Sequence, residues 1–224
     1  MPASITDLKV LHNFLLYKKL KYRIGRQRTR ADGNCFLDML LQNMRHLSAA
    51  GKWNKNIPAS VHEVRSLFID YMKANRQEFV GYKDSDGRFV GGPLDADMFD
   101  NLIENQSQKN AYTDEEGFFV LAACKCLNIE LVIVVTSIDS PIIQSGMGGP
   151  VQRINSGSNR PVFCSALIRN EEVRTGHYQF IHEHEDGEPE SFTMPVESNT
   201  LLFQSQSQSG CKIKLFLYYS KILF

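Results

Sequence analysis

One uncharged run of β-branched residues limits the folds open to this chain. Apart from Glu130, residues 129–136 are isoleucine, leucine and valine with a terminal threonine, and they carry no charge after that glutamate. A short run of this composition is typical of a strand that is buried on both faces. We therefore expect a buried central strand here.

Two further strands are predicted downstream. Residues 162–168 form a second apolar run, and residues 177–182 alternate and are rich in aromatic side chains. The segment between them, 169–176, predicts a turn that joins the two strands as an antiparallel pair.

Helix signals occur around these strands. Ser60 and Glu63 form a capping box at the start of one helix, and Thr113 and Glu116 form another ahead of the central strand. Apolar residues at helical spacing over 5–21 predict an N-terminal helix. The expected fold class is α/β, of the α+β kind, with a small mixed or antiparallel central sheet flanked by helices.

A cysteine lies at a position that suits nucleophilic chemistry. Cys35 follows the turn-prone Asp32, Gly33 and Asn34 and precedes an apolar, helix-like run. Gly33 can take a positive φ at no steric cost. Cys35 would then lie in the first turn of a helix, where unpaired N–H groups and the helix dipole favour a thiolate. The same N–H groups are suited to hold an oxyanion.

A base for this cysteine is predicted far downstream, in the strand of residues 177–182. Side chains two positions apart share one face of a strand, so His177 and Gln179 would be neighbours. His182 would point to the opposite face, and His184 lies in the acidic stretch that follows. A zinc site from these last two histidines lacks a second ligand pair. We therefore prefer His177 as the base.

The motif Asp-Gly-Asn-Cys-Phe at 32–36, followed by a helix, resembles the OTU (ovarian tumour) family of cysteine proteases. The Gly-His-Tyr at 176–178 fits the same family. Residues 61–79 and 115–134 resemble its second helix and its central helix and strand, in the same order. The resemblance covers roughly residues 25–183. It implies a papain-like OTU domain that cleaves ubiquitin or ubiquitin-like modifiers from lysines.

The resemblance also implies roles for the site residues. Cys35 would be the nucleophile and His177 the general base and acid. Asp32, three residues before the nucleophile, would shape the loop. Backbone amides of Asp32, Gly33, Asn34 and Cys35 would form the oxyanion hole.

The sequence departs from the family at Gln179, where Asp or Asn is usual. A glutamine carbonyl can accept the imidazole N–H, so Gln179 is a possible residue to orient His177. It carries no charge, however, and is one methylene longer than asparagine. Three alternatives stay open: a functional but weaker triad, an orienting acid from elsewhere in the chain, or an inactive enzyme. We favour the first.

The expected function is that of a thiol-dependent isopeptidase, a cysteine-type deubiquitinase, with ubiquitin or a ubiquitin-like modifier as partner and without a cofactor or metal. The alternative is a catalytically weak or inactive OTU-like module that binds ubiquitin or a partner protein. A globular α/β domain without an active site is a third reading. The presence of both Cys35 and His177 favours the enzyme, because a binding module needs neither.

Net charge and cysteine content bear on the binding partners and on the cellular compartment. The formal net charge is zero, so the whole molecule shows no bias toward nucleic acid or membranes. No apolar run reaches the roughly 20 residues that span a bilayer. Five cysteines without framework spacing, and no N-terminal signal sequence, favour a reducing, cytoplasmic location. Cys124 and Cys126 are expected to pack in a helix rather than to bind metal.

Three segments are expected along the chain. Residues 1–24 would be an N-terminal helical extension, 25–183 the OTU-like domain, and 184–224 a low-complexity, disordered tail. The basic stretch 18–30 is interpreted as a solvated helix end and loop, with a patch that binds an acidic surface or nucleic acid as the alternative. The apolar end, 213–224, receives no role.

Overall fold

The computed structural model describes residues 5–29, 33–83, 89–92, 94–108, 118–137, 151–157, 159–170, 175–183 and 196–197. Its helices are α1 (Ile5–Tyr17), α2 (Cys35–Ala49), α3 (Val61–Ala74), α4 (Arg76–Phe79), α5 (Ala96–Gln108) and α6 (Phe118–Leu127). Its strands are β1 (Tyr22–Ile24), β2 (Gln27–Arg28), β3 (Gly81–Lys83), β4 (Phe89–Gly91), β5 (Glu130–Ser137), β6 (Val151–Ile154), β7 (Val162–Asn170), β8 (Thr175–Glu183) and β9 (Val196–Glu197).

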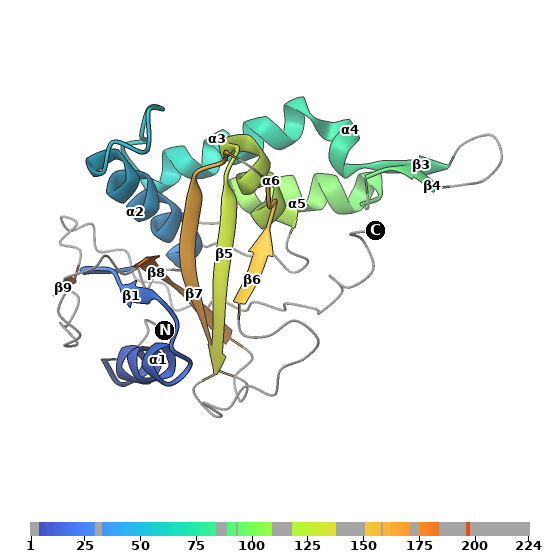
Figure 1. The fold of residues 1–224 in the computed structure, drawn as a ribbon. Helices are drawn as coiled ribbons and strands as arrows, with labels where there is room; N and C mark the ends of the chain where they lie inside the picture. Colours follow the sequence, from blue (N-terminus) through green and yellow to red (C-terminus); the bar gives the residue numbers. More distant parts are fainter. Residues whose placement is uncertain are drawn as a thin grey trace.

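A five-stranded sheet in the order β1-β8-β7-β5-β6 forms the centre of the fold (Figure 1). β5 and β7 run parallel, and the other neighbours are antiparallel. The strands predicted at 129–136, 162–168 and 177–182 are β5, β7 and β8, and the antiparallel pairing of the last two is confirmed. The expected α+β class, with a small mixed sheet flanked by helices, is confirmed as well.

Side chains that alternate along β5 divide the core into two layers. Leu131, Ile133 and Val135 lie in the cluster that α2, α3, α5 and α6 cover. Val132 and Val134 lie in a second cluster with the apolar residues of α1. Because both faces of the strand are covered, the positions from Leu131 to Val135 are all apolar, and the charged Glu130 lies at the first position of the strand.

The N-terminal residues belong to the same sheet. Leu8, Leu11 and Leu15 of α1 are buried against its second face. β1 pairs with the last residues of β8. The sheet therefore crosses the boundary that the sequence suggested at residue 24. From the predicted tail, 184–224, the structure describes β9, which pairs in parallel with β2, and the rest of that prediction lies outside the described residues.

Helix starts agree with the sequence where they are described. Ser60 Oγ accepts a hydrogen bond from the Glu63 amide at 3.2 Å, which confirms that capping box. The Glu63 carboxylate accepts the N–H of Ala59 at 2.9 Å, one residue earlier than the usual reciprocal bond. The second predicted box, at 113–116, lies outside the described residues.

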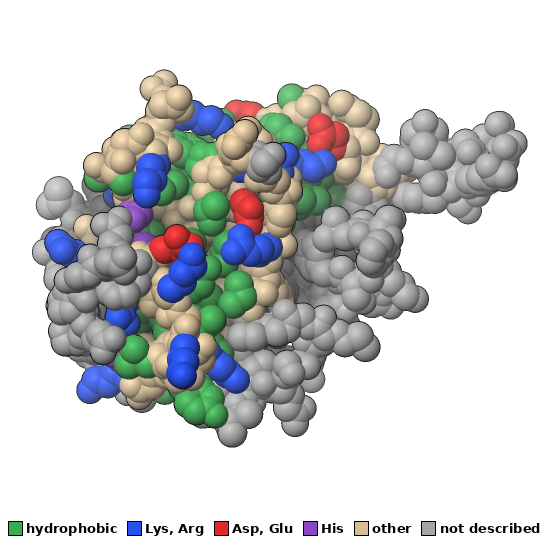
Figure 2. Space-filling view, viewed as in Figure 1, with side chains coloured by type: hydrophobic (Ala, Val, Ile, Leu, Met, Phe, Trp, Pro, Cys, Tyr) green, Lys and Arg blue, Asp and Glu red, His purple; other side chains and the backbone are tan. Residues whose placement is uncertain are grey.

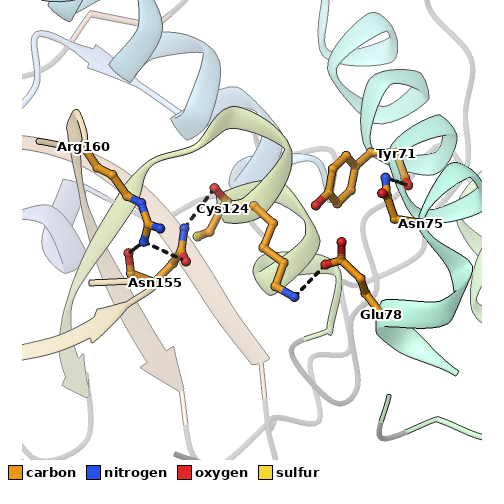
Figure 3. Close-up of polar contacts among 7 residues, drawn as sticks. Tyr71, Asn75, Glu78, Cys124, Asn155 and Arg160 are labelled. Carbon is orange, nitrogen blue, oxygen red and sulfur yellow. Dashed lines mark hydrogen bonds and ion pairs between the residues drawn. The ribbon is translucent and has the colours of Figure 1, made fainter. Parts of the chain in front are cut away.

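A polar network fixes the end of α6 and the entry into β5 (Figure 3). Asn128 takes a positive φ of 51°, which lets the Ile129 amide bond back to the Cys124 carbonyl at 3.0 Å. Asn155 donates to the Ile129 carbonyl at 2.8 Å and to that of Cys124 at 3.3 Å. Arg160 in turn donates to the Asn155 carbonyl at 2.6 Å. The turn after β6 therefore holds the helix end in place.

Two observations bear on the charge and the apolar character of the described residues. None of the helices in the described ranges is long and apolar enough to cross a membrane. On the face shown in Figure 2, Lys and Arg side chains are scattered among acidic and apolar ones. Within the basic stretch, Lys21 pairs with Glu183 at 3.0 Å, and both side chains are exposed.

Candidate active site

Cys35 is the first residue of α2, as predicted. Gly33 takes the expected positive φ, at 82°, and so turns the chain into the helix. Asn34 is the N-cap residue, and its carbonyl accepts the first helical bond, from the Asp38 amide at 2.9 Å. The Cys35 side chain is only 2% exposed. Asp32 lies outside the described residues, so three of the four residues predicted for the oxyanion hole are described.

A buried arginine holds Asn34, the residue before Cys35. Asparagine is a favoured N-cap residue, but the Asn34 side chain makes no capping bond. Its Oδ1 accepts a hydrogen bond from Arg65 of α3. Arg65 also donates to Gln106 Oε1 on α5 at 2.9 Å, and all three side chains are buried. The Asn34 side chain is therefore bound to α3 and does not cap α2.

Sequence reasoning missed Arg65, although a signal was present. Arg65 lies four residues after Val61 and three before Phe68, on the apolar face of the predicted helix. A lone charged residue on such a face is one that the fold must pair with polar groups. Arg65 is therefore a residue that the sequence alone can single out.

α2 lies along β8 and runs in the same direction. Near its start, the ring of Phe36 lies 5.1 Å from that of Tyr178, and near its end the ring of His46 lies 5.1 Å from that of His182. The helix between these contacts rises about 15 Å. The strand between them extends about 13 Å. The start of α2, with Cys35, therefore lies at the same end of β8 as His177.

His177 lies on β8 and is buried, with 7% of its surface exposed. Tyr178 and Phe180 belong to the core layer of α2, whereas Ile181 belongs to the layer of α1. By the alternation of a strand, His177 and Gln179 share the face of Ile181. His182 falls on the other face, as the sequence predicted, and His184 lies outside the described residues.

The hydrogen-bond partner of His177 is Thr29, in the segment that precedes the Cys35 loop. Thr29 Oγ1 lies 2.7 Å from His177 Nε2, and it also donates to the carbonyl of Tyr178. Gln179 accepts the backbone N–H of Thr29 at 3.4 Å and donates to the carbonyl of Gln27 at 3.1 Å. Among the hydrogen bonds of the described residues, Gln179 is therefore linked to His177 through Thr29.

Burial sets the charge of His177. It lowers the pKa of the imidazole to about 4, and the positive charge of Arg28 contributes in the same direction. The imidazole is therefore neutral near pH 7. A neutral imidazole is the state that a general base requires.

Burial holds three other described cysteines as thiols. Burial raises the pKa of Cys124 to about 12, that of Cys126 to about 11 and that of Cys164 to about 12. All three stay as thiols near neutral pH, and a thiol is a poor nucleophile and a poor metal ligand. The described residues hold no group of three or more His, Cys, Asp or Glu side chains that could bind a metal ion.

No protein-family model and no curated protein matches the chain. Similar solved structures include the OTU domain of OTUD1, at 16% identity over 80% of this chain and 96% of that one, with a TM-score of 0.46. The OTU of Hazara virus bound to ubiquitin is 13% identical over 73% and 82% of the two chains, with a TM-score of 0.41. The OTU protease of Farallon virus is 13% identical over 72% and 84%, with a TM-score of 0.41. All three are OTU domains, the family that the sequence motifs resemble.

Proposed function

We propose that this chain is a thiol-dependent isopeptidase of the OTU type. It would hydrolyse the bond between the C-terminal glycine of ubiquitin, or of a ubiquitin-like modifier, and a lysine. The observation that carries the proposal is the placement of Cys35 at the start of α2, at the end of β8 where the neutral, buried His177 lies. The motifs at 32–36 and 176–178 support the choice of modifier as substrate.

The chemistry follows from these positions. His177 takes the thiol proton, and the Cys35 thiolate attacks the carbonyl carbon of the modifier's terminal glycine. The negative charge moves to the carbonyl oxygen, which first-turn amides of α2 and the loop before it stabilise. The protonated His177 then gives its proton to the leaving lysine amine. Water hydrolyses the thioester and restores the thiol.

Asp32, in this proposal, shapes the loop that supplies backbone amides. The proposed setting is a reducing, cytoplasmic one, because the nucleophile must remain a free thiol and five cysteines give no disulfide framework. Neither a cofactor nor a metal takes part in any step.

One observation favours the alternative, a catalytically weak or inactive OTU-like module that binds ubiquitin or a partner. Cys35 is only 2% exposed, so a substrate carbonyl reaches its sulfur only if neighbouring residues move. Substrate binding can supply such a movement. A module that only binds ubiquitin would not need a movement that exposes the Cys35 sulfur.

A ubiquitin that carries a thiol-reactive electrophile at its C-terminus separates the two functions. We expect the wild-type protein to form a covalent adduct and Cys35→Ala to form none. Cys126→Ala serves as the matched control, because it removes a partly exposed cysteine elsewhere and should keep the adduct. A folded wild-type protein that forms no adduct with this probe, but still binds ubiquitin, would support the module instead.

A further inference from the structure

We propose that Thr29 is the positioning residue of His177: its hydroxyl holds the imidazole in the tautomer that carries the proton on Nε2. The tautomer follows from hydrogen bonds alone, and its consequence for catalysis rests on the function proposed above. In this proposal, Gln179 supports Thr29 and does not itself orient the histidine.

The direction of the bond to His177 is set by the other neighbours of the Thr29 hydroxyl. A hydroxyl has one proton to donate and two lone pairs that accept. Thr29 Oγ1 is in hydrogen-bond contact with the Tyr178 carbonyl and lies 3.4 Å from Gln179 Oε1. Both of these oxygens can only accept. The Thr29 hydroxyl therefore donates its single proton to a carbonyl oxygen. In its 2.7 Å hydrogen bond with His177 it must accept, so the donor is His177 Nε2–H.

The orientation of the Gln179 amide is fixed independently. Its oxygen faces the backbone N–H of Thr29, which can only donate. Its nitrogen faces the carbonyl of Gln27, which can only accept. An exchange of the oxygen and nitrogen would break both contacts. The acceptor beside the Thr29 hydroxyl is therefore an oxygen.

The segment that carries Thr29 is held against β8 along its length. The Gly25 amide donates to the Phe180 carbonyl at 3.0 Å. A Cβ atom on Gly25 would lie 2.1 Å from the ring of Phe180, so only glycine allows this close approach. Gln179 then ties Gln27 and Thr29 to the same strand. The length of the glutamine side chain is what lets it reach this segment.

The tautomer decides which ring nitrogen acts as the base. With the proton on Nε2, the lone pair is on Nδ1, and Nδ1 is the atom able to take the proton of Cys35. When His177 is protonated, Nε2–H still donates to Thr29, so the ring keeps its orientation through the cycle. A hydroxyl supplies orientation without negative charge, in keeping with the lowered pKa of His177.

The tautomer can be measured without any activity. Nitrogen chemical shifts of ¹⁵N-labelled histidine, recorded near pH 7.5 and assigned by the loss of signal in His177→Gln, distinguish Nε2–H from Nδ1–H. We expect Nε2–H in the wild type and in Thr29→Ser, which keeps the hydroxyl. We expect a mixture, or Nδ1–H, in the isosteric Thr29→Val. A wild-type Nδ1–H signal, or an unchanged signal in Thr29→Val, would overturn the proposal.

The catalytic arm uses the hydrolysis of a ubiquitin C-terminal amide. Thr29→Val should lower kcat by about 10–100-fold with KM nearly unchanged, by analogy with the loss of a hydrogen-bond partner that orients a metal-binding histidine. Thr29→Ser should stay within a few-fold of the wild type. Thr136→Val is the matched control, since Thr136 is buried on β5 and its hydroxyl has no hydrogen-bond partner among the described residues.

The outcomes separate this proposal from the proposed function. An active wild type whose kcat is unchanged by Thr29→Val would refute the positioning role and leave the isopeptidase standing. An inactive wild type that shows the Nε2–H signal, lost in Thr29→Val, would refute the isopeptidase and leave the role of Thr29 in setting the tautomer.

Discussion

The ring of Phe36 packs edge-on against that of Tyr178, with centroids 5.1 Å apart and planes inclined by 63°. Each ring belongs to the residue directly after a proposed catalytic residue, since Phe36 follows Cys35 and Tyr178 follows His177. Both rings are fully buried in the layer between α2 and the sheet. This contact therefore joins the start of α2 to β8, the strand that carries the proposed base.

The first prediction concerns this aromatic contact. Phe36→Leu should lower the free energy of unfolding by about 1–2 kcal/mol and lower kcat more than it raises KM, because the helix start loses its fixed position. Phe68→Leu is the matched control: Phe68 is equally buried, and it packs edge-on against Phe119 of α6 and not against β8. It should cost similar stability and leave kcat unchanged. Equal losses of kcat in the two variants would contradict the role of Phe36.

The second prediction concerns the attachment of α2 to β7. The Asn43 side chain accepts from the Cys164 amide at 2.9 Å and donates to the Cys164 carbonyl at 3.1 Å. The pairing of β7 with β8 ends at Ser165 and Phe180, and the next residues of β8 pair with β1. Asn43 therefore bonds to Cys164 just beyond the point where the pairing of β7 with β8 ends. Asn43→Leu leaves two buried backbone groups without partners and should lower the free energy of unfolding by about 2–4 kcal/mol.

Urea denaturation of Asn43→Leu measures that cost. Asn101→Leu provides the comparison, because Asn101 is an exposed asparagine on α5. A change there should be within about 0.5 kcal/mol. If the two substitutions cost the same, the bonds of Asn43 do not hold the helix to the sheet.

The third prediction concerns pH. The pKa of His177 is lowered by folding from an ordinary 6.5 to about 4, so between these values the unfolded chain binds a proton that the folded protein does not. Stability should therefore fall as the pH is lowered through this window, by up to about 3 kcal/mol, and show no further loss from this group below it. Denaturation curves from pH 7 to pH 4 measure this fall.

Two variants isolate the contribution of His177. His177→Gln should flatten the stability profile between pH 6.5 and pH 4, because the group that titrates differently in the two states is gone. His62→Gln, on the exposed side of α3, should leave the profile as in the wild type. A profile that is unchanged in His177→Gln would show that this histidine is not buried in its neutral form.

The fourth prediction concerns cysteine reactivity. Cys124, Cys126 and Cys164 are held as thiols by burial, which raises the pKa of each well above neutral. Cys35, at a helix N-terminus, should be the described cysteine that iodoacetamide modifies fastest at pH 7. Mass spectrometry of digests over time gives each rate. Faster modification of the partly exposed Cys126 would show that access, and not thiolate character, controls reactivity.

Local patterns in the sequence were sufficient for several parts of the fold. The run at 129–136, uncharged after Glu130, predicted β5 because both faces of that strand are covered. Gly33 predicted the start of α2 because a positive φ is needed there. The pair Ser60 and Glu63 predicted the start of α3 because both side chains bond within one turn.

Contacts between distant segments could not be predicted in this way. Thr29 and His177 are 148 positions apart, and no pattern around a threonine between two arginines indicates its partner. For a related reason, the sequence did not predict the strand β1. Its residues, 22–24, lie in a basic stretch that reads as solvated, and they become a strand because β8 offers a free edge.

The central claim is that Cys35 and His177 act together on the carbonyl of a modifier's terminal glycine. The most direct measurement is kcat/KM for the hydrolysis of a lysine-linked ubiquitin isopeptide by the wild type, Cys35→Ala, His177→Ala and the double variant. We predict that each single variant falls to the background rate and that the double variant is no worse, because residues that act as a unit are not additive. A folded single variant that retains the wild-type rate would contradict the claim.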